Sequence, residues 1–380
     1  MSRLKLVLSD GFILEGDLFG YKLPEKEVIK GEVVFNTSMS GYQEIMTDPS
    51  YAGQIMTFTN SYIGNTGINE IDNESDSIHI TSMICRNYSK TCSNYRATST
   101  LEDYLIKNKI TALENVDTRK LVKHLRDNGS KLSIIANSLD YSNEELITMS
   151  QDLQQIYKIN YVKKVSTNKE YDWKQGVFNL ETNSFNEPKT DESSPLVAVL
   201  DCGVKFNILR LLVDSGFRVK VLPAYSTKED ILKLNPSGLF ISNGPGDPAL
   251  LTEIVDVVES LLGQIPIFGI CLGHQILSQA NGAKTYKLKF GHRGANHPVL
   301  NKLTGKIDIT VQNHGYAVDP KTLKNEKDIS YINLNDQTIE GLKLKDKHAF
   351  SVQHHPEASP GPQDCLNLFD KFYKLVENYA

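Results

Sequence analysis

The 380-residue sequence lacks the features that would place it in a membrane, at the cell exterior or on nucleic acid. It has no apolar run long enough to span a bilayer, and its first residues turn polar at Ser9 and Asp10, too soon for a signal peptide. The net charge of −5 argues against proteins that bind nucleic acid or membrane surfaces through basic patches. We therefore expect a globular protein of the cytoplasm.

Cysteine is scarce, and the common phosphate-binding motifs are missing. The five cysteines are far apart, odd in number and without a C-x-x-C pair, which favours reduced thiols over a disulfide framework or a zinc ribbon. Neither a Walker A motif nor G-x-G-x-x-G occurs, so nothing in this chain looks like an ATP site. Seven of the nine histidines follow residue 270, which directs the search for chemistry to the C-terminal part.

The chain length corresponds to two or three domains. A hydrophilic stretch rich in Asn, Ser, Thr and Glu precedes Pro195 and is typical of an interdomain linker. We therefore predict an N-terminal domain over residues 1–150, a linker over 151–193 and a C-terminal domain over 194–380.

The predicted N-terminal domain is mixed α/β and rich in short strands. Residues 4–19 alternate apolar and polar side chains around Asp10-Gly11, which indicates a β-hairpin. Asp117 is placed to cap a helix that ends at Asn128-Gly129. The stretch 36–53 is rich in turn formers and hydroxyls, shows no periodicity, and has the composition of a surface loop.

The predicted C-terminal domain alternates strands with helices, which indicates a doubly wound, mostly parallel α/β sheet. In such sheets, ligands bind beyond the carboxyl ends of the strands. Strands are expected over 196–200, 217–222, 238–242 and 265–270, and helices over 204–215, 252–262 and 272–281.

One cysteine lies between two glycines where a strand should turn into a helix. Gly269, Cys271 and Gly273 follow a short apolar run, in the arrangement of a nucleophile elbow with a thiol. Glycines permit the tight backbone, and the positive end of the following helix favours a thiolate. The alternative is a buried structural cysteine beside packing glycines.

A catalytic thiol needs a base, and the base needs a partner that orients it. His355 and Glu357 flank a proline directly after a strand-like run, 84 residues beyond Cys271 (355 − 271). This trio on a parallel sheet favours acyl transfer, with the Leu272 amide as one oxyanion donor. The glycine-rich loop 243–246 is a candidate source of the second donor, although it also has the composition of a plain turn.

A metal site is the other use for the C-terminal histidines. His292, His297, His354 and His355 are close in sequence, but none of their spacings matches the one-face helical pair of a metalloprotease. We therefore predict no metal ligands, and we interpret His354 as a structural histidine.

The motifs resemble those of one enzyme family. FGICLGHQ (268–275), SNGPGDP (242–248) and the later HPE are similar to the class I, or triad, glutamine amidotransferases. More of the chain resembles the small, glutamine-hydrolysing subunits of carbamoyl-phosphate synthetases, including the N-terminal half that other triad amidotransferases lack. The matching segments are KFGHRGANHPV (289–299), QNHGYAV (312–318), FNTSMSGYQEIMTDPSYAGQI (35–55) and DTRKLVKHLR (117–126).

The resemblance implies Cys271 as nucleophile, His355 as base and acid, and Glu357 as the orienting carboxylate. It implies that the N-terminal domain lends Ser50 to the glutamine site and contacts a synthetase partner. The implied glutamine-binding residues are Ser50, Gly244, Gly246, Leu272, Gln275, Asn313, Gly315 and Tyr316.

The resemblance also implies a partner and a pathway. Ammonia would pass to a large synthetase subunit, in a heterodimer or a higher oligomer of heterodimers, where ATP and Mg²⁺ would bind; this chain would hold no cofactor. The product would serve arginine and pyrimidine synthesis. Two alternatives stay open: a different thiol hydrolase or amidotransferase, and a non-enzymatic assembly subunit.

Overall fold

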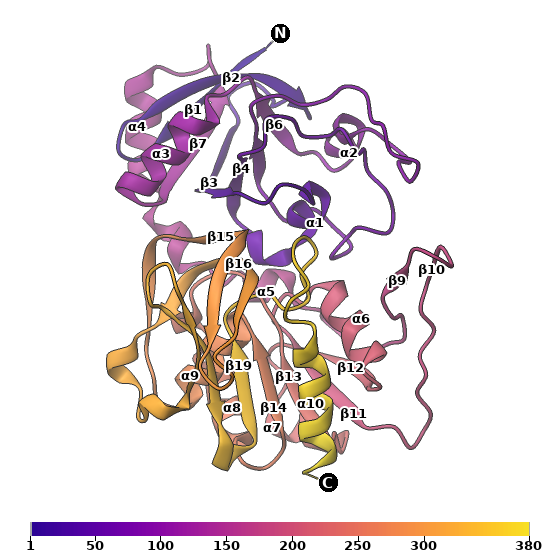
Figure 1. Ribbon diagram of the computed structural model, residues 1–380. Helices are drawn as coiled ribbons and strands as arrows, with labels where there is room; N and C mark the ends of the chain where they lie inside the picture. The colour runs from indigo at the N-terminus through magenta and orange to yellow at the C-terminus, as the bar shows by residue number, and fades with distance from the viewer. Residues whose placement is uncertain (1, 380) are drawn as a thin grey trace. The chain divides into compact units, whose positions relative to one another are not determined.

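The computed structural model describes residues 2–379 as two compact units (Figure 1). Of the described residues, the first unit comprises 2–159 and the short segment 289–293, and the second comprises 160–288 and 294–379. Among the described residues, no helix is long and apolar enough to cross a membrane.

The N-terminal unit is built on a closed seven-stranded barrel in the order β1-β2-β6-β5-β4-β3-β7. The predicted hairpin is confirmed, because β1 pairs antiparallel with β2 across the Asp10-Gly11 turn. Pairing of β1 with β7 closes the barrel and leaves no free sheet edge. The strands are β1 (Arg3–Leu8), β2 (Ile13–Gly20), β3 (Val28–Asn36), β4 (Gln54–Phe58), β5 (Ser82–Ile84), β6 (Thr111–Glu114) and β7 (Lys131–Asn137).

The helices of this unit include two, α1 and α4, that the sequence did not indicate. Helix α3 is confirmed, with the Asp117 side chain accepting from the Lys120 amide. The stretch 36–53 is not simply a surface loop, because Tyr42, Ile45 and Met46 on α1 are buried in a hydrophobic core of this unit. The helices are α1 (Tyr42–Thr47), α2 (Leu101–Lys107), α3 (Thr118–Asn128) and α4 (Asn143–Gln151), with 3-10 turns η1 (Pro49–Tyr51) and η2 (Asp152–Lys158).

The C-terminal unit contains a ten-stranded sheet in the order β16-β15-β17-β18-β19-β14-β13-β11-β12-β8. Its centre is parallel, from β12 through β11, β13 and β14 to β19, and antiparallel strands extend both edges. The strands are β8 (Tyr171–Trp173), β11 (Leu196–Asp201), β12 (Arg218–Pro223), β13 (Gly238–Ile241), β14 (Ile267–Ile270), β15 (Thr285–Asn301), β16 (Ile307–Val318), β17 (Ile329–Asn333), β18 (Ile339–Leu344) and β19 (Ala349–Val352).

Helices cover both faces of this sheet, which confirms the predicted doubly wound α/β class. Successive residues of one strand enter different cores: Phe268 packs with α6 and α10, and Ile267 packs with α8 and α9. The helices are α5 (Val162–Val165), α6 (Phe206–Asp214), α7 (Lys228–Lys233), α8 (Thr252–Leu261), α9 (Leu272–Ala280) and α10 (Asn367–Glu377).

The stretch 151–193, predicted as linker, contains regular structure. It holds η2, α5, β8 and a small pair of strands, β9 (Phe178–Asn179) with β10 (Ser184–Phe185). Strand β8 joins the large sheet beside β12, with Trp173 opposite Val219, and Tyr171 and Trp173 pack against the core. β8 docks on the sheet because these two aromatic side chains are apolar, although the stretch around them is polar.

Phe372 on α10 offers a test of how the C-terminal unit is stabilised. Its side chain is fully buried beside the rings of Phe217 and Phe268, at centroid distances of 5.2 and 5.6 Å. We expect Phe372→Ala to lower the free energy of unfolding of this unit by about 3–5 kcal/mol, because it leaves a cavity. Denaturant unfolding followed by intrinsic fluorescence measures the change. Leu180→Ala, at a position 69% exposed, should stay within about 0.5 kcal/mol.

Candidate active site

Cys271 lies at a strained turn between β14 and α9. Its backbone has φ 54° and ψ −103°, which few residues other than glycine adopt, and its amide donates to the Val352 carbonyl at 2.9 Å. A Cβ at Gly273 would lie 2.1 Å from the Ile241 carbonyl oxygen, and one at Gly269 would lie 2.5 Å from that of Gly273. The two glycines are therefore required by close packing of the turn, as the nucleophile-elbow prediction needs.

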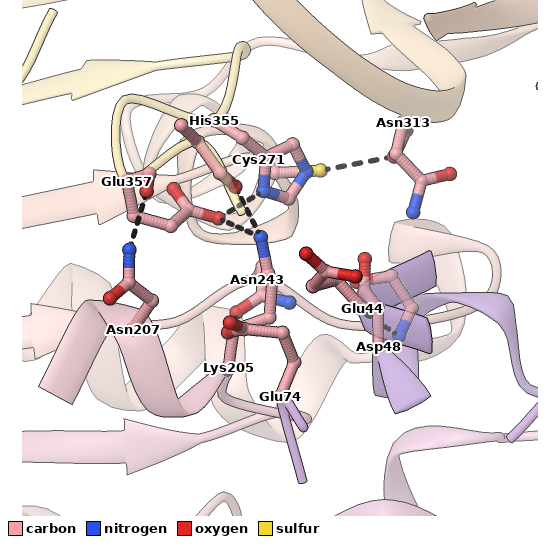
Figure 2. Close-up of polar contacts among 12 residues, drawn as sticks. Glu44, Asp48, Glu74, Lys205, Asn207, Asn243, Cys271, Asn313, His355 and Glu357 are labelled. Carbon is pink, nitrogen blue, oxygen red and sulfur yellow. Dashed lines mark hydrogen bonds and ion pairs between the residues drawn. The ribbon is translucent and has the colours of Figure 1, made fainter. Parts of the chain in front are cut away.

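The base, His355, lies just after β19, the strand next to β14. Strand β19 runs parallel to β14 with Ile270 opposite Val352, so the chain leaves both strands at the same sheet edge. His355 Nδ1 lies 2.7 Å from Glu357 Oε1, and both side chains are buried. Figure 2 shows the imidazole between the Glu357 carboxylate and the Cys271 sulfur. Because a carboxylate only accepts, Nδ1 carries a proton and Nε2 is directed to the thiol side.

Charge stabilises this arrangement. Burial alone would lower the pKa of His355, but the Glu357 carboxylate and the Cys271 side chain outweigh burial and raise it. Burial alone would raise the pKa of Glu357, but the Lys205 ammonium and the His355 imidazole lower it to about 2. Glu357 therefore remains ionised and favours the protonated form of His355, the form that an acyl-transfer step generates.

Lys205 and Asn207 are site residues that the sequence reasoning missed. Lys205 Nζ donates to Glu357 Oε1 at 2.9 Å and to the Ala358 carbonyl at 2.7 Å, and Asn207 Nδ2 donates to the Glu357 carbonyl at 2.6 Å (Figure 2). Lys205 is only 2% exposed. The available signal was its place just beyond the carboxyl end of β11, where ligands bind in such sheets.

The loop with one candidate oxyanion donor, Gly244, packs against the residue that carries the other, Leu272. Leu272 is the first residue of α9, so its amide has no carbonyl partner one turn earlier in the helix. A Cβ built on Gly244 would lie 2.8 Å from Leu272 Cδ2 and 2.2 Å from the Cys202 carbonyl oxygen. Gly246, in the same loop, has φ 94°. The loop therefore packs its glycine backbone against the start of α9.

Three further predicted glutamine-binding residues lie on β16. The Asn313 carbonyl oxygen is 3.5 Å from Cys271 Sγ, and the Tyr316 carbonyl accepts from Gln275 Nε2 at 2.9 Å. Gly315, half-buried, lies between them. The same Gln275 nitrogen also donates to Gln353 Oε1 at 3.0 Å, so this side-chain nitrogen is held within the fold. These contacts bring β16 alongside the nucleophile, while direct contact with glutamine stays a prediction.

Ser50 belongs to the N-terminal unit, in the 3-10 turn η1. Its amide donates to the Asp48 side chain at 2.9 Å, and the residue is 7% exposed. Its predicted share in the glutamine site stays a prediction.

His354, interpreted as structural, is fully buried in the C-terminal unit. Its Nδ1 lies 3.8 Å from Glu340 Oε2, and its ring makes an edge contact with Tyr331 at 5.5 Å. His355 meanwhile directs Nδ1 to Glu357. The two adjacent histidines therefore face different carboxylates.

A buried Cys-His-Glu set at the carboxyl ends of parallel strands defines the class I glutamine amidotransferase type of site. Comparison with known families agrees: residues 198–375 match "Glutamine amidotransferase class-I", and residues 6–135 match "Carbamoyl-phosphate synthase small chain, CPSase domain". The chain belongs to the carbamoyl phosphate synthase small-chain family. Members of this type are the glutamine-dependent amidotransferase subunit of the enzyme.

The similarity to curated small chains extends over nearly the whole sequence. The small chain of Syntrophotalea carbinolica is 47% identical over 98% of this chain and 97% of its own length. That of Akkermansia muciniphila is 46% identical over 98% and 97%. The chloroplastic small chain of Arabidopsis thaliana is 43% identical over 98% of this chain and 85% of its own length.

Replacing Lys205 tests the charge argument through pH. Lys205 is the largest influence that lowers the pKa of Glu357, so Lys205→Met should raise that pKa. The acid limb of kcat/KM for glutamine hydrolysis should then move to higher pH, whereas Lys205→Arg should keep it near the wild-type position. An acid limb unchanged in Lys205→Met would contradict the assignment.

The same pair gives a stability test with a defined sign. The pKa of Glu357 is lower in the folded chain than its ordinary 4.5, so ionised Glu357 stabilises the fold above that pH. This contribution should disappear as pH falls toward 2, and it should be smaller in Lys205→Met. Unfolding free energies measured between pH 7 and the acid limit test the difference.

Proposed function

We propose that Cys271 attacks the side-chain amide of glutamine and forms a γ-glutamyl thioester. His355 Nε2 accepts the thiol proton and then gives it to the departing nitrogen, which leaves as ammonia. Glu357, hydrogen-bonded to His355 Nδ1, stabilises the imidazolium that forms between these two steps. The Leu272 and Gly244 amides stabilise the oxyanion of each tetrahedral intermediate.

The thioester is then hydrolysed by water. His355 takes a proton from the water, the hydroxide adds to the thioester carbonyl, and the Cys271 thiolate leaves with glutamate as product. The observation that carries the proposal is the 2.7 Å contact between His355 and Glu357, which follow β19, beside the positive-φ Cys271 that follows β14. These residues meet through parallel pairing of β14 and β19, although they are far apart in sequence.

The ammonia passes to a large synthetase chain, which supplies ATP and Mg²⁺ and forms carbamoyl phosphate from bicarbonate. The support is that relatives spanning nearly the whole chain are carbamoyl phosphate synthase small chains, a name that implies a larger companion. In this proposal the enzyme works in the cytoplasm and its product serves arginine and pyrimidine synthesis. The N-terminal unit contacts the large chain, and Ser50 contributes to glutamine binding.

Cys271→Ser separates glutamine hydrolysis from the synthetase reaction. In the complex with the large chain, kcat for glutamine hydrolysis should fall by about a thousandfold or more, because a hydroxyl is a much weaker nucleophile than a thiolate. Synthesis of carbamoyl phosphate from added ammonia should continue at close to the wild-type rate. Cys92→Ser, at a partly exposed thiol outside the site, is the matched control. Retained glutamine use in Cys271→Ser would sink the mechanism.

Covalent labelling distinguishes an active thiol from the structural ones. Burial raises the pKa of the Cys85 and Cys202 thiols, so they should remain protonated and unreactive at neutral pH. A glutamine analogue with an electrophilic carbon should therefore modify Cys271 alone among these three, and glutamine should protect it. Mass spectrometry of tryptic peptides identifies the modified residue. A chain that kept the fold without the chemistry would show no glutamine-protected label.

A further inference from the structure

The C-terminal unit has a second hollow, separate from the cysteine site. It has a volume of about 540 Å³ and lies between α10 and the β17-β18-β19 part of the sheet. This volume falls in the range of pockets that hold small molecules. None of the residues proposed to bind or hydrolyse glutamine lines it.

The floor of the hollow is apolar because two elements present hydrophobic side chains to it. Leu368 and Leu375 lie two turns apart on one face of α10; Leu368 is buried in the core with Phe369, Phe372 and Val376, and Leu375 packs against that core. Phe350 of β19, half-buried, completes the floor.

The rim is cationic. Lys343 lies directly opposite Phe350 in the β18-β19 pairing, so both side chains are on one face of the sheet, and Lys345 follows two residues later. Lys371 and Lys374, one turn apart on α10, face the same hollow. All four lysines are exposed, and none forms an ion pair or side-chain hydrogen bond with residues 2–379.

The lining of the hollow contains no acidic residue among the described residues, although the chain as a whole carries a net charge of −5. Four ammonium groups at the mouth of one cavity repel each other, and an anion placed there relieves that repulsion. An apolar floor gains free energy when a ring displaces water from it.

We propose that this hollow binds a small anionic ligand that carries an aromatic or comparably flat apolar ring. The ring lies on Phe350 and the two leucines, and the anionic group meets the ammonium groups of Lys371 and Lys374. The inference goes beyond glutamine hydrolysis and does not rest on it.

The hollow adjoins the strands that lead to the catalytic residues. Phe350 stacks on Phe268 of β14 at a centroid distance of 4.3 Å, and Tyr331, which also lines the hollow, contacts the His354 ring. The bound ring therefore rests on β19, the strand that leads to His355, and Phe350 in turn packs on β14, which leads to Cys271.

The test uses 8-anilinonaphthalene-1-sulfonate, an anion with two aromatic parts, as the probe of this ligand class. The full chain should bind it saturably at one site, more weakly as salt rises, and more tightly than the uncharged analogue N-phenyl-1-naphthylamine. Lys371→Glu/Lys374→Glu should raise the Kd about tenfold or more, because it reverses two of the four rim charges. Fluorescence titration measures each Kd.

Two variants control for charge and for access. Lys324→Glu/Lys327→Glu makes the same charge change at exposed lysines outside the hollow and should leave the Kd unchanged. Thr304→Trp places a bulky ring at an exposed lining position without altering charge and should block the probe. Circular dichroism confirms that each variant is folded.

Three results would overturn the proposal: equal binding by the Lys371→Glu/Lys374→Glu variant, equal binding of the uncharged analogue, or a salt-sensitive dimer in sedimentation that this variant abolishes. The last result would assign the hollow to a second copy of the chain. Titrations of Cys271→Ser should match wild type, so failure of the hydrolytic mechanism leaves this test intact.

Discussion

The parallel pairing of β14 with β19 is the constraint on which the site depends. A parallel pair brings both carboxyl ends to one edge, so a cysteine after one strand and a histidine after the other meet without a dedicated scaffold. The pairing is buried on both faces, by α6 and α10 on one side and by α8 and α9 on the other. Because the two catalytic loops share this support, a shift of either strand would change the distance between thiol and base.

The second constraint is the burial of three ionisable side chains that contact one another in series. Lys205, Glu357 and His355 are almost completely excluded from water, and each would be costly to bury alone. Contact between them offsets that cost, and the low-polarity surroundings strengthen the same contacts. The base is consequently held in one tautomer and one orientation before substrate arrives. Lys205 thereby acts on the reaction through Glu357, without any need to touch glutamine.

Much of the C-terminal unit could be predicted, because most strands and helices from β11 to α9 leave a local signal in the sequence, although the short helix α7 was missed. Closure of the N-terminal barrel could not be predicted. It depends on pairs such as Leu4 with Asn137, and alternation of apolar and polar residues identifies a strand but not its distant partner. Lys205 was missed for a similar reason: its contact with Glu357 spans 152 residues. The Cys271 elbow and the His355-Glu357 pair were accessible, since glycine spacing and a short motif encode them locally. The short strand β8 was hidden because its few aromatics lie in a polar stretch.

The strained backbone of Cys271 lowers the stability of the fold at a position that catalysis requires. A non-glycine residue at φ 54° and ψ −103° stores on the order of 1–3 kcal/mol of conformational strain, which the neighbouring packing must hold. Glycine would release that strain, so a chain without its nucleophile is expected to be harder to unfold than the native chain. Selection for fold stability alone would therefore favour replacement of Cys271. Selection for catalytic activity is what retains the cysteine.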